Sequence, residues 1–475
     1  MSASAWRSFW WISLHLVAIL LLCCCLFLSS LPFEFTFDDH LAIVNNRDVD
    51  PSLTRAIDLW RHDCWGKDLD RIDSHRSYRP LLILIFRLIR TLGGLEPSTF
   101  RLVSICAHGM ASLLVYALAV LLTGDLSTAF ASALLFVSHP VHVEGVVAVV
   151  NMAEPLSCCL FSLAFALYWI HTRSETKRWI HRIALTLICL PLGLLSIIGS
   201  LLIKETAVTA TGVIIASSAV HLIGEIARTG HVWLSTKSWL PRHGIWVLMS
   251  LLVLIFYVAL RVAIIAFNPV EVAVTHGLLP LLQKTFLAIS SKEARDSVFL
   301  ERSELIRKAE NPFAFLQGQE KLLSMTYLHS RYLSLLIWPH PLSAEYSFDC
   351  IPKVHSISDP RNLYSVATYT SLLLALCLSF GAILFPGKES FGNIPYRSTA
   401  EILMHLLIWL VVSFIPASGV FLRLGTLLAE RLLYTPSGTH YLQYNVFERL
   451  FQLPTLYFAL WLYNGVLQYL EKFPL

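Results

Sequence analysis

The sequence predicts an all-α polytopic membrane protein, from its composition and from its long apolar stretches. Hydrophobic residues make up 56% of the 475 residues and charged residues only 14%, whereas soluble domains carry roughly 25% charged residues. The mean hydropathy is +0.63. A soluble surface with so few charges would expose large apolar patches, and fibrous, collagen-like and disordered chains are excluded as well. The net charge of +4 gives no reason to expect nucleic acid as a partner.

The apolar stretches indicate about 10 to 11 membrane spans, since a helix needs about 20 mostly apolar residues to cross a bilayer. The predicted spans are Phe9–Leu31, Leu102–Leu122, Leu126–Val137, Leu156–Ile170, Ile183–Leu202, Ala207–Ile223, Gly244–Phe267, Val366–Phe385, Ile402–Val420 and Leu453–Tyr469. The first exceeds the apolar core of a signal peptide and no small-residue cleavage site follows, so we interpret it as a helix. The third is short and runs into a polar motif.

Two further apolar stretches are expected to lie at the membrane surface. Leu333–Leu342 is too short to cross and contains Pro339 and Pro341, so it either lies at the interface or re-enters the membrane. Leu81–Arg90 is apolar with arginines towards one end, which is typical of a helix in the headgroup layer.

Basic residues in the short loops predict the orientation. Lys and Arg are concentrated in His171–Arg182, Glu225–His243 and Pro386–Ser398, which ten spans place on one side together with the N-terminus. By the positive-inside rule that side is cytosolic. The long polar segments Pro32–Arg101 and Asn268–Ser330 are then expected in the lumen or outside.

Most of the ten cysteines fall within predicted spans, and only Cys64 and Cys350 lie in long polar loops. If these loops face an oxidising lumen, the two thiols can form a disulfide. Two unrelated thiols are an equal alternative.

Polar clusters follow five of the apolar stretches, and all of them fall on the predicted lumenal side. They are Asp38-Asp39; His139, His142 and Glu144 with nearby Glu154; Lys204-Glu205; Glu345 with Asp349; and Glu430-Arg431. Charges at membrane depth are costly and by default mark a functional cavity. Structural charges would be scattered over both sides, so the pattern predicts a single lumenal site.

Each cluster also has a simpler interpretation. Lys204 and Glu205 can be a local ion pair at a helix end. His139, His142 and Glu144 offer three metal ligands, but Pro140 breaks the helical spacing and no further ligand completes the set. The adjacent carboxylates Asp38 and Asp39 repel one another, a cost usually tolerated for a base or a cation site.

The motifs resemble the transmembrane and tetratricopeptide-repeat-containing protein O-mannosyltransferases, a family of the GT-C glycosyltransferase class. The resemblance runs through most of the chain and includes FDDHLAIVNNRDV, SHRSYRPL, HPVHVEGV with NMAEPLS, LLIKETAV, ENPFAF, WPHPLSAEYSFDCIP and AERLLYTPS. It implies a GT-C-type bundle that transfers mannose from dolichyl-phosphate mannose to Ser or Thr of secretory proteins, cadherins among them, in the endoplasmic reticulum lumen.

The implied reaction assigns roles to the clustered residues. Asp38 is expected to be the base, with Asp39 as second choice, in a single inverting displacement. His139, His142, Lys204 and Arg431 are the candidate donors to the leaving phosphate. Glu144 and Glu154 are expected to orient these cations or to hold sugar hydroxyls, and Glu205 and Glu430 complete the predicted site. No metal or other cofactor is expected, because the leaving group carries no diphosphate.

Residues 1–475 are expected to form one membrane domain, and the chain departs from the family pattern in places. No tetratricopeptide repeats follow the spans, and Tyr441–Phe451 includes Asn445, Glu448 and Arg449 where the family has another clear span. A truncated chain, a divergent short member and one half of something larger remain alternatives. A GT-C enzyme acting on a lipid-linked oligosaccharide and a catalytically silent scaffold are the alternative functions, and a secondary transporter is disfavoured because no internal repeat is seen.

Overall fold

The computed structural model describes most of the chain in side-chain detail. The described residues are 3–266 except 72 and 175–177; 280–281, 283–285 and 287; and 307–442 except 344, 386–389, 392–393, 422–423 and 440–441.

Eight described helices are long and apolar enough to cross a membrane, and a bent pair raises the number to nine. They are carried by α1 (Ala3–Phe27), α3 (Pro97–Thr123), α6 (Ala153–Arg173), α7 (Trp179–Ile203), α8 (Thr209–Thr229), α10 (Ile245–Ala266), α15 (Asn362–Leu384) and α16 (Tyr396–Phe414), with α4 (Leu126–Ser138) and α5 (Val143–Val147) as the bent pair. The all-α polytopic class is confirmed, and nine of the ten predicted stretches coincide with these helices. The tenth, Leu453–Tyr469, lies outside the described residues.

The short third span is bent by 50° rather than incomplete. Helix α4 stops at Ser138 because the next two residues are His139 and Pro140: proline lacks an N–H and disfavours helical backbone in the residue before it. His139 is extended (φ −70°, ψ 123°), and a 3₁₀ turn, η5 (Pro140–His142), leads into α5. The bend brings the polar motif back against the bundle.

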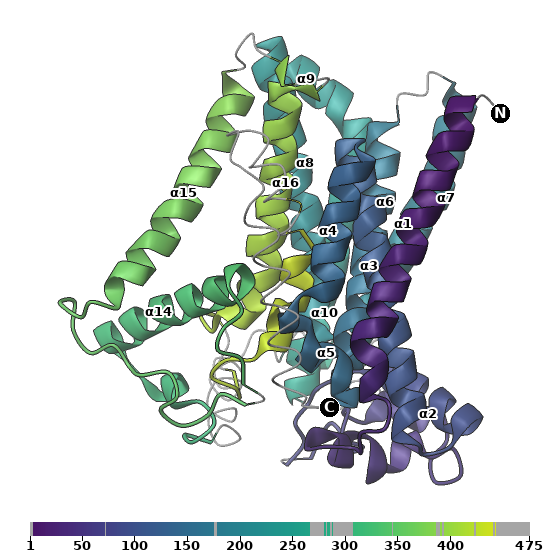
Figure 1. Ribbon diagram of the computed structural model, residues 1–475, viewed down its shortest axis with the longest axis vertical. Coiled ribbons are helices and arrows are strands. Elements are labelled where there is room, and N and C mark those ends of the chain that lie inside the picture. Colours follow the sequence, from purple (N-terminus) through teal and green to yellow (C-terminus); the bar gives the residue numbers. More distant parts are fainter. Residues whose placement is uncertain are drawn as a thin grey trace.

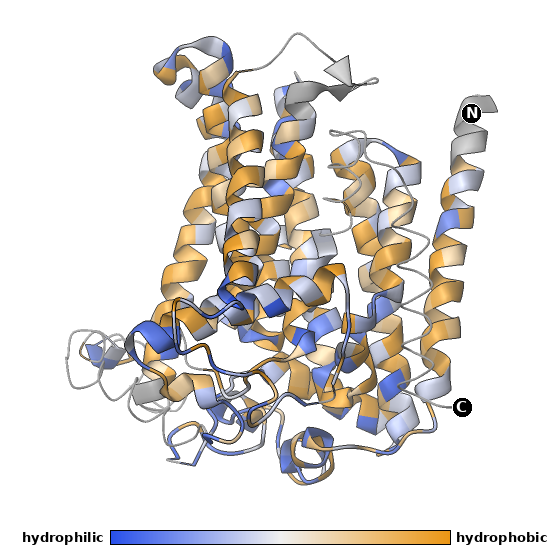
Figure 2. Cartoon of the chain, turned by 60° about the vertical axis from the view of Figure 1, so that its left-hand side comes forward, coloured by the Kyte–Doolittle hydropathy of each residue, from blue (hydrophilic) through white to orange (hydrophobic). Residues whose placement is uncertain are grey.

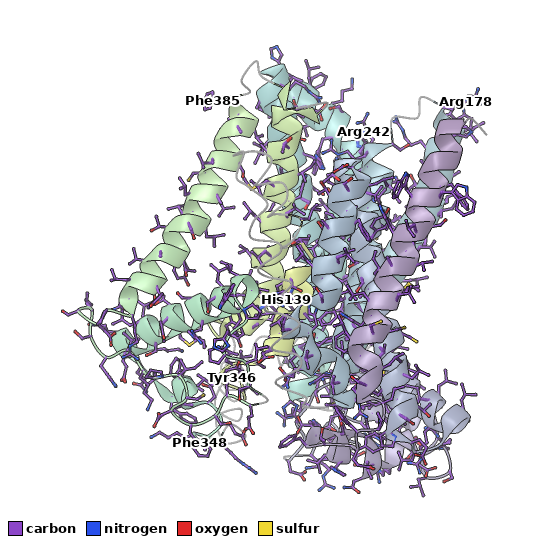
Figure 3. The ribbon with its side chains drawn as sticks, viewed as in Figure 1. His139, Arg178, Arg242, Tyr346, Phe348 and Phe385 are labelled. Carbon is purple, nitrogen blue, oxygen red and sulfur yellow. The ribbon has the colours of Figure 1, made fainter. Side chains whose placement is uncertain are left out.

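The predicted cytosolic loops gather at one end of the bundle. Arg178, Arg242 and Phe385, which belong to or adjoin the three basic loops, lie at the end that also holds the N-terminus, whereas Tyr346 and Phe348 lie at the opposite end (Figures 1 and 3). Hydrophobic colour runs along the long helices, and hydrophilic residues gather in the loops at the end opposite the N-terminus (Figure 2). We call that end the loop-rich end.

Both predicted surface segments are helices that do not qualify as spans. Helix α2 (Pro80–Gly93) lies at the loop-rich end, and α14 (Gly318–Ile337) runs across the direction of the bundle (Figure 1). Residues 81–90 lie within α2 and residues 333–337 at the end of α14. Their position at the membrane surface stays a prediction.

Short elements complete the chain. They are η1 (Leu28–Ser30), η2 (His40–Val44), η3 (Arg47–Val49), η4 (Asp58–Arg61), η6 (Val149–Met152), η7 (Glu205–Val208), α9 (Val232–Trp239), η8 (Leu240–Gly244), η9 (Pro312–Phe315), η10 (Ile415–Ser418), η11 (Glu430–Leu433) and a strand pair, β1 (Ser390–Phe391) with β2 (Ile394–Pro395). Several of them connect spans at the loop-rich end and carry most of the predicted polar site residues.

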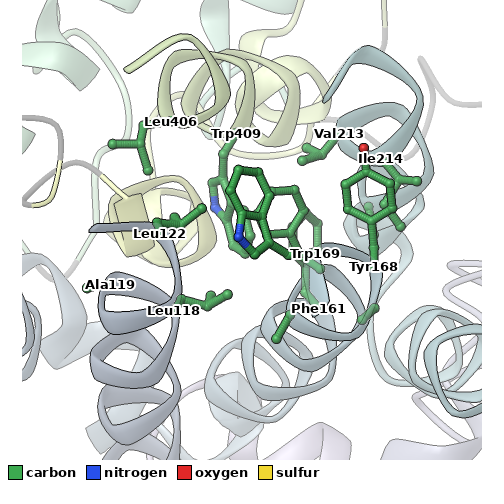
Figure 4. Close-up of a cluster of buried hydrophobic side chains, with 14 of the residues drawn as sticks. Leu118, Ala119, Leu122, Phe161, Tyr168, Trp169, Val213, Ile214, Leu406 and Trp409 are labelled. Carbon is green, nitrogen blue, oxygen red and sulfur yellow. The ribbon is translucent and has the colours of Figure 1, made fainter. Parts of the chain in front are cut away.

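Aromatic side chains fill the centre of the bundle. Trp409 of α16 packs on Phe161 of α6 with ring centroids 4.6 Å apart, and leucines of α3 and residues of α8 surround them (Figure 4). Trp246 of α10 lies so close to Gly193 of α7 that a Cβ there would be 2.5 Å from its ring. Small residues allow such close approach between membrane helices.

The first loop is held together by buried polar groups. The Asp63 carboxylate accepts hydrogen bonds from the Ser74 hydroxyl and from three backbone N–H groups. Cys64 is buried with its Sγ 2.7 Å from the Ser77 hydroxyl, whereas Cys350 is exposed, and both thiols are free. The alternative of two unrelated thiols therefore describes this structure.

His62 connects two carboxylates in the same loop. Its ring is 6% exposed, with Nδ1 2.8 Å from Asp48 Oδ2 and Nε2 3.1 Å from Asp68 Oδ1. The hydrogen bond to Asp48 raises the pKa of His62 above its usual value, more than burial lowers it. The protonated ring is therefore the form that stabilises the loop.

We predict that the first loop loses stability with rising pH. The contribution of His62 should be complete below the unfolded pKa of about 6.5 and should vanish as the pH rises through the higher folded pKa. Pulse proteolysis of residues 47–79 across this range measures the effect. The His62→Gln variant should show a flatter profile, and an unchanged profile in that variant would contradict the assignment.

Candidate functional site

The adjacent carboxylates after α1 have different environments. Asp39 is fully buried, and its two oxygens accept hydrogen bonds from the backbone N–H groups of Val150 (2.8 Å) and Thr36 (3.2 Å). Burial raises the pKa of Asp39, while these N–H groups and Arg101 act in the opposite direction. Asp38 is exposed at the same turn. Asp39 therefore anchors the turn to η6, and Asp38 presents its carboxylate outward.

Lys204 forms an ion pair with Glu154 and not with the adjacent residue Glu205. It lies directly after α7, is 7% exposed, and forms an ion pair with Glu154 in the first turn of α6, which is 3% exposed. Glu205 instead bonds Arg79 of the first loop, with Nε 2.9 Å from Oε2. The interpretation of Lys204 and Glu205 as a local pair is therefore wrong: adjacent side chains point in different directions, and each finds a partner elsewhere.

A third ion pair joins the bent span to the C-terminal segment. Glu144 of α5 bonds the Arg431 guanidinium and also accepts the Arg431 backbone N–H at 2.9 Å. Glu430 is fully buried and accepts from the Ser343 N–H (3.0 Å) and the Tyr346 hydroxyl (2.9 Å). Glu430 and Arg431 thus attach η11 to two separate parts of the chain: Glu430 to Ser343 and Tyr346, and Arg431 to α5.

The two histidines of the motif act as structural groups in this structure. His139 is 1% exposed; its Nε2 donates to the Leu336 carbonyl (3.1 Å) and its Nδ1 accepts the Val141 N–H (3.1 Å). His142 is fully buried, with Nδ1 donating to the Phe136 carbonyl (2.7 Å) and Nε2 2.8 Å from the Ser437 hydroxyl. All four ring nitrogens are used within the fold, so the rings are not placed to contact a phosphate, and Glu144 is turned away towards Arg431.

A narrow cavity opens beside the Lys204–Glu154 pair. Its walls come from the start of α6, from η7 and α8, from the end of α16 and from the segment after η11. They are lined by Glu154, Phe161, Lys204, Thr206, Ala207, Thr209, Ser413, Ala417, Leu432, Thr435 and Pro436. The lining offers the Lys204 ammonium, which is paired with Glu154, and several hydroxyl-bearing residues, and the remainder is apolar. The cavity has a volume of about 10 Å³, which is room for one water molecule.

The structure brings together only some of the predicted site residues. Glu154 and Lys204 line the cavity, and charged side chains of Glu144, Glu205 and Arg431 act electrostatically on Lys204. Glu345 and Asp349 lie on exposed surface, where they bond Ser347 and Lys353. Sequence reasoning missed Arg79 and Arg101. The Arg101 guanidinium is 1% exposed and donates to the backbone carbonyls of Glu34 and Val147, which no spacing in the sequence indicates.

These features define a polytopic membrane protein with a charged cavity at the loop-rich end of its bundle. The family "Protein O-mannosyl-transferase TMTC, DUF1736" matches residues 302–373. Human protein O-mannosyl-transferase TMTC3 is 31% identical over 415 residues, covering 86% of this chain and 40% of the relative. Mouse TMTC4 is 30% identical over 451 residues, covering 90% of this chain and 54% of the relative. Human TMTC2 is 28% identical, covering 87% of this chain and 50% of the relative.

The chain is similar to TMTC proteins over most of its length, which confirms the resemblance inferred from the motifs. It spans about half the length of these curated relatives, which are named protein O-mannosyl-transferases. No solved structure matches the chain.

We predict that the partner of Lys204 can be identified by double substitution. Lys204→Met alone leaves the Glu154 carboxylate buried and unpaired, which should lower the free energy of unfolding by about 3–5 kcal/mol. Adding Glu154→Leu should restore most of that stability, whereas adding Glu205→Leu should not, because it strands Arg79. Thermal unfolding in lipid nanodiscs measures all three variants. Equal rescue by the two double variants would contradict the pairing.

Proposed function

We propose that this chain forms the membrane part of a protein O-mannosyltransferase that moves mannose from dolichyl-phosphate mannose to Ser or Thr side chains. The observation that carries the proposal is the cavity beside Lys204, at the loop-rich end of a lipid-embedded bundle. The apolar chain of a polyprenyl donor stays in the lipid, so the protein must bind the donor's phosphate at the membrane surface. The names of the relatives support this activity at the level of the family.

Lys204 is the group best placed to hold the donor phosphate. Its ammonium lines the cavity, and the residues Thr206, Thr209 and Thr435 bring hydroxyl groups to the same walls. Charge-assisted hydrogen bonds of this kind are strong and favour the charge that develops on a leaving phosphate. Glu154 holds the ammonium in position. Arg431, held by Glu144, supplies positive potential nearby.

Asp38 is the better of the two candidate bases. Both Asp39 oxygens already accept backbone hydrogen bonds, so Asp39 has the role of fixing the turn. Asp38 is exposed and can accept the proton of an incoming hydroxyl. Attack on the sugar face opposite the phosphate inverts the anomeric centre in one displacement. The acceptor would be a Ser- or Thr-bearing secretory protein in the lumen of the endoplasmic reticulum.

We predict that Asp38→Asn folds normally but loses transfer by about 10²–10⁴-fold, the usual effect of removing a general base. The assay is transfer from radiolabelled dolichyl-phosphate mannose in microsomes with matched protein levels. Asp70→Asn, at another exposed aspartate of the same loop, should transfer at the wild-type rate. Near-wild-type transfer by Asp38→Asn would remove the assignment.

We also predict that the loop-rich end faces the lumen. The chain contains no natural Asn-x-Ser/Thr sequon, so engineered sequons give a clean readout. A sequon placed at Asp70 should be glycosylated in cells, and one placed at Lys237 should not. Glycosylation at Lys237 alone would put the cavity in the cytosol, where neither the donor sugar nor secretory acceptors are presented.

A further inference from the structure

Arg101, near the start of α3, joins two segments that are distant in the sequence. Its Nε donates to the Val147 carbonyl (3.0 Å) at the end of α5, and its Nη2 donates to the Glu34 carbonyl (3.1 Å). Its Nη1 bonds the carbonyls of Phe33 and Leu31, the latter at 3.5 Å. The side chain is 1% exposed. One buried guanidinium therefore connects the segment that follows η1 to the end of α5.

A guanidinium suits these carbonyls because of where they lie. Residues 33–36 have no regular secondary structure, and Val147 is the last residue of α5, where helix carbonyls lack intrahelical partners. A guanidinium carries five N–H donors in a rigid planar fork, so it can bond carbonyls of two segments at once. A lysine ammonium is a single point, so in this place it would bond one segment and leave the other without that donor.

Asp39 makes a second connection between the same two parts of the chain. Its Oδ1 accepts from the Val150 N–H (2.8 Å) in η6, directly after α5, and its Oδ2 accepts from the Thr36 N–H (3.2 Å). Asp38, which is exposed, therefore lies close to two connections to one stretch of chain, the first at Glu34 and the second at Asp39.

The turn between these connections has a costly backbone conformation. Phe37 has φ +45°, in the left-handed region that favours glycine. A bulky residue rarely adopts this conformation and keeps it only where the surrounding structure imposes it. Because the Phe37 ring is 78% exposed, packing of the ring does not hold it there. The connections on either side are the constraint, and the resulting turn directs Asp39 inward and Asp38 outward.

The same connections fix Asp38 relative to the Lys204 site. Residues 143–154 begin with α5 and end in the first turn of α6, where Glu154 pairs with Lys204. Val150, whose N–H holds the turn, lies four residues before Glu154. The candidate base and the candidate phosphate ligand are therefore attached to one short stretch of chain.

We propose that Arg101 is a positioning residue for the transfer reaction: by bonding residues 31–34 to Val147, it holds the Asp38 carboxylate in place relative to the donor. This inference rests on the proposed function, in which Asp38 accepts the proton of the acceptor hydroxyl. Arg101 is buried, so it acts through the turn and not by contact with a substrate. A misplacement of about 1 Å at the reacting groups can cost roughly 10²-fold in rate.

Hydrogen exchange tests the connection without requiring any mannose transfer. The full chain in nanodiscs is compared with Arg101→Lys, which keeps the charge but cannot bond both segments. Exchange of the backbone N–H groups in residues 31–40 should become about tenfold faster or more, the effect of losing one hydrogen bond to a charged group. Exchange in residues 47–79 should not change. Wild-type exchange in residues 31–40, or equal acceleration in both ranges, would overturn the proposal.

Ser104→Ala is the matched control for this comparison. Ser104 lies one turn along α3 from Arg101, is fully buried, and its hydroxyl has no hydrogen-bond partner among the described residues. Its removal should therefore leave both exchange and transfer at their wild-type rates. An effect equal to that of Arg101→Lys would show that any change at this end of α3 loosens the turn, which would overturn the specific role of the guanidinium.

Transfer kinetics test whether Arg101 acts through Asp38. In Arg101→Lys, kcat should fall by about 10²-fold while the donor KM stays within about twofold, because the Lys204 site is unchanged. On the Asp38→Asn background, the same substitution should cost less than about threefold more, because the turn then has no base left to position. Equal losses on both backgrounds would overturn the proposal.

Asp39→Asn makes the same comparison from the second connection. It leaves Arg101 in place and serves if Arg101→Lys does not accumulate. An amide nitrogen cannot accept a hydrogen bond, so one of the two bonds to Thr36 and Val150 is lost. The variant should lower kcat at an unchanged donor KM and add little to the loss in Asp38→Asn. A wild-type kcat in Asp39→Asn would overturn the proposal.

The two proposals can fail separately. Wild-type protein that transfers no mannose would remove the proposed function and the positioning role with it, even where Arg101→Lys speeds exchange. Wild-type protein that transfers mannose, with the same kcat in Arg101→Lys, would keep the proposed function and remove only the positioning role.

Discussion

A buried ammonium and a buried carboxylate, Lys204 and Glu154, meet where α6 begins and α7 ends, and the geometry of the site depends on this pair. A charge inside an apolar bundle is tolerated only with a partner, so the two helix ends cannot separate or rotate without exposing an unpaired charge. Two further pairs, Arg79–Glu205 and Arg431–Glu144, attach the first loop and the C-terminal segment to the same region. Segments that are far apart in sequence are therefore fixed around one cavity.

The hydropathy pattern was sufficient to predict most of the fold. Apolar length located nine of the described spans, and loop charge placed the three basic loops together, because both properties reflect the bilayer as solvent and need no knowledge of tertiary contacts. The same properties do not predict which charged residues form ion pairs with one another. Lys204 and Glu205 are neighbours in sequence, yet each bonds a residue from a different segment, and only the packed bundle determines which.

The roles of the two histidines in the His139–Glu144 motif also could not be predicted from the sequence. His139 and His142 have the chemistry of phosphate ligands or metal ligands, and their residue type and spacing favoured those roles. Their roles arise because two helices end nearby: the bend at Pro140 ends α4 after the Phe136 carbonyl, and the last turn of α14 carries the Leu336 carbonyl. Ring nitrogens of the two histidines bond these carbonyls. The signal that could have indicated this was the proline itself, because a broken span buries polar backbone that requires side-chain partners.

The alternation of charges around the cavity also bears on how substrates arrive. Arg79, Lys204 and Arg431 are matched by Glu205, Glu154 and Glu144, so this set of charges sums to zero before any donor binds. A neutral set of close ion pairs produces little electrostatic potential beyond about a Debye length, roughly 8–10 Å at physiological salt. An anionic lipid would not be drawn in from a distance, as substrates are in strongly charged funnels. Encounter would instead depend on lateral diffusion within the leaflet, with a rate set by membrane fluidity and donor density rather than by ionic strength.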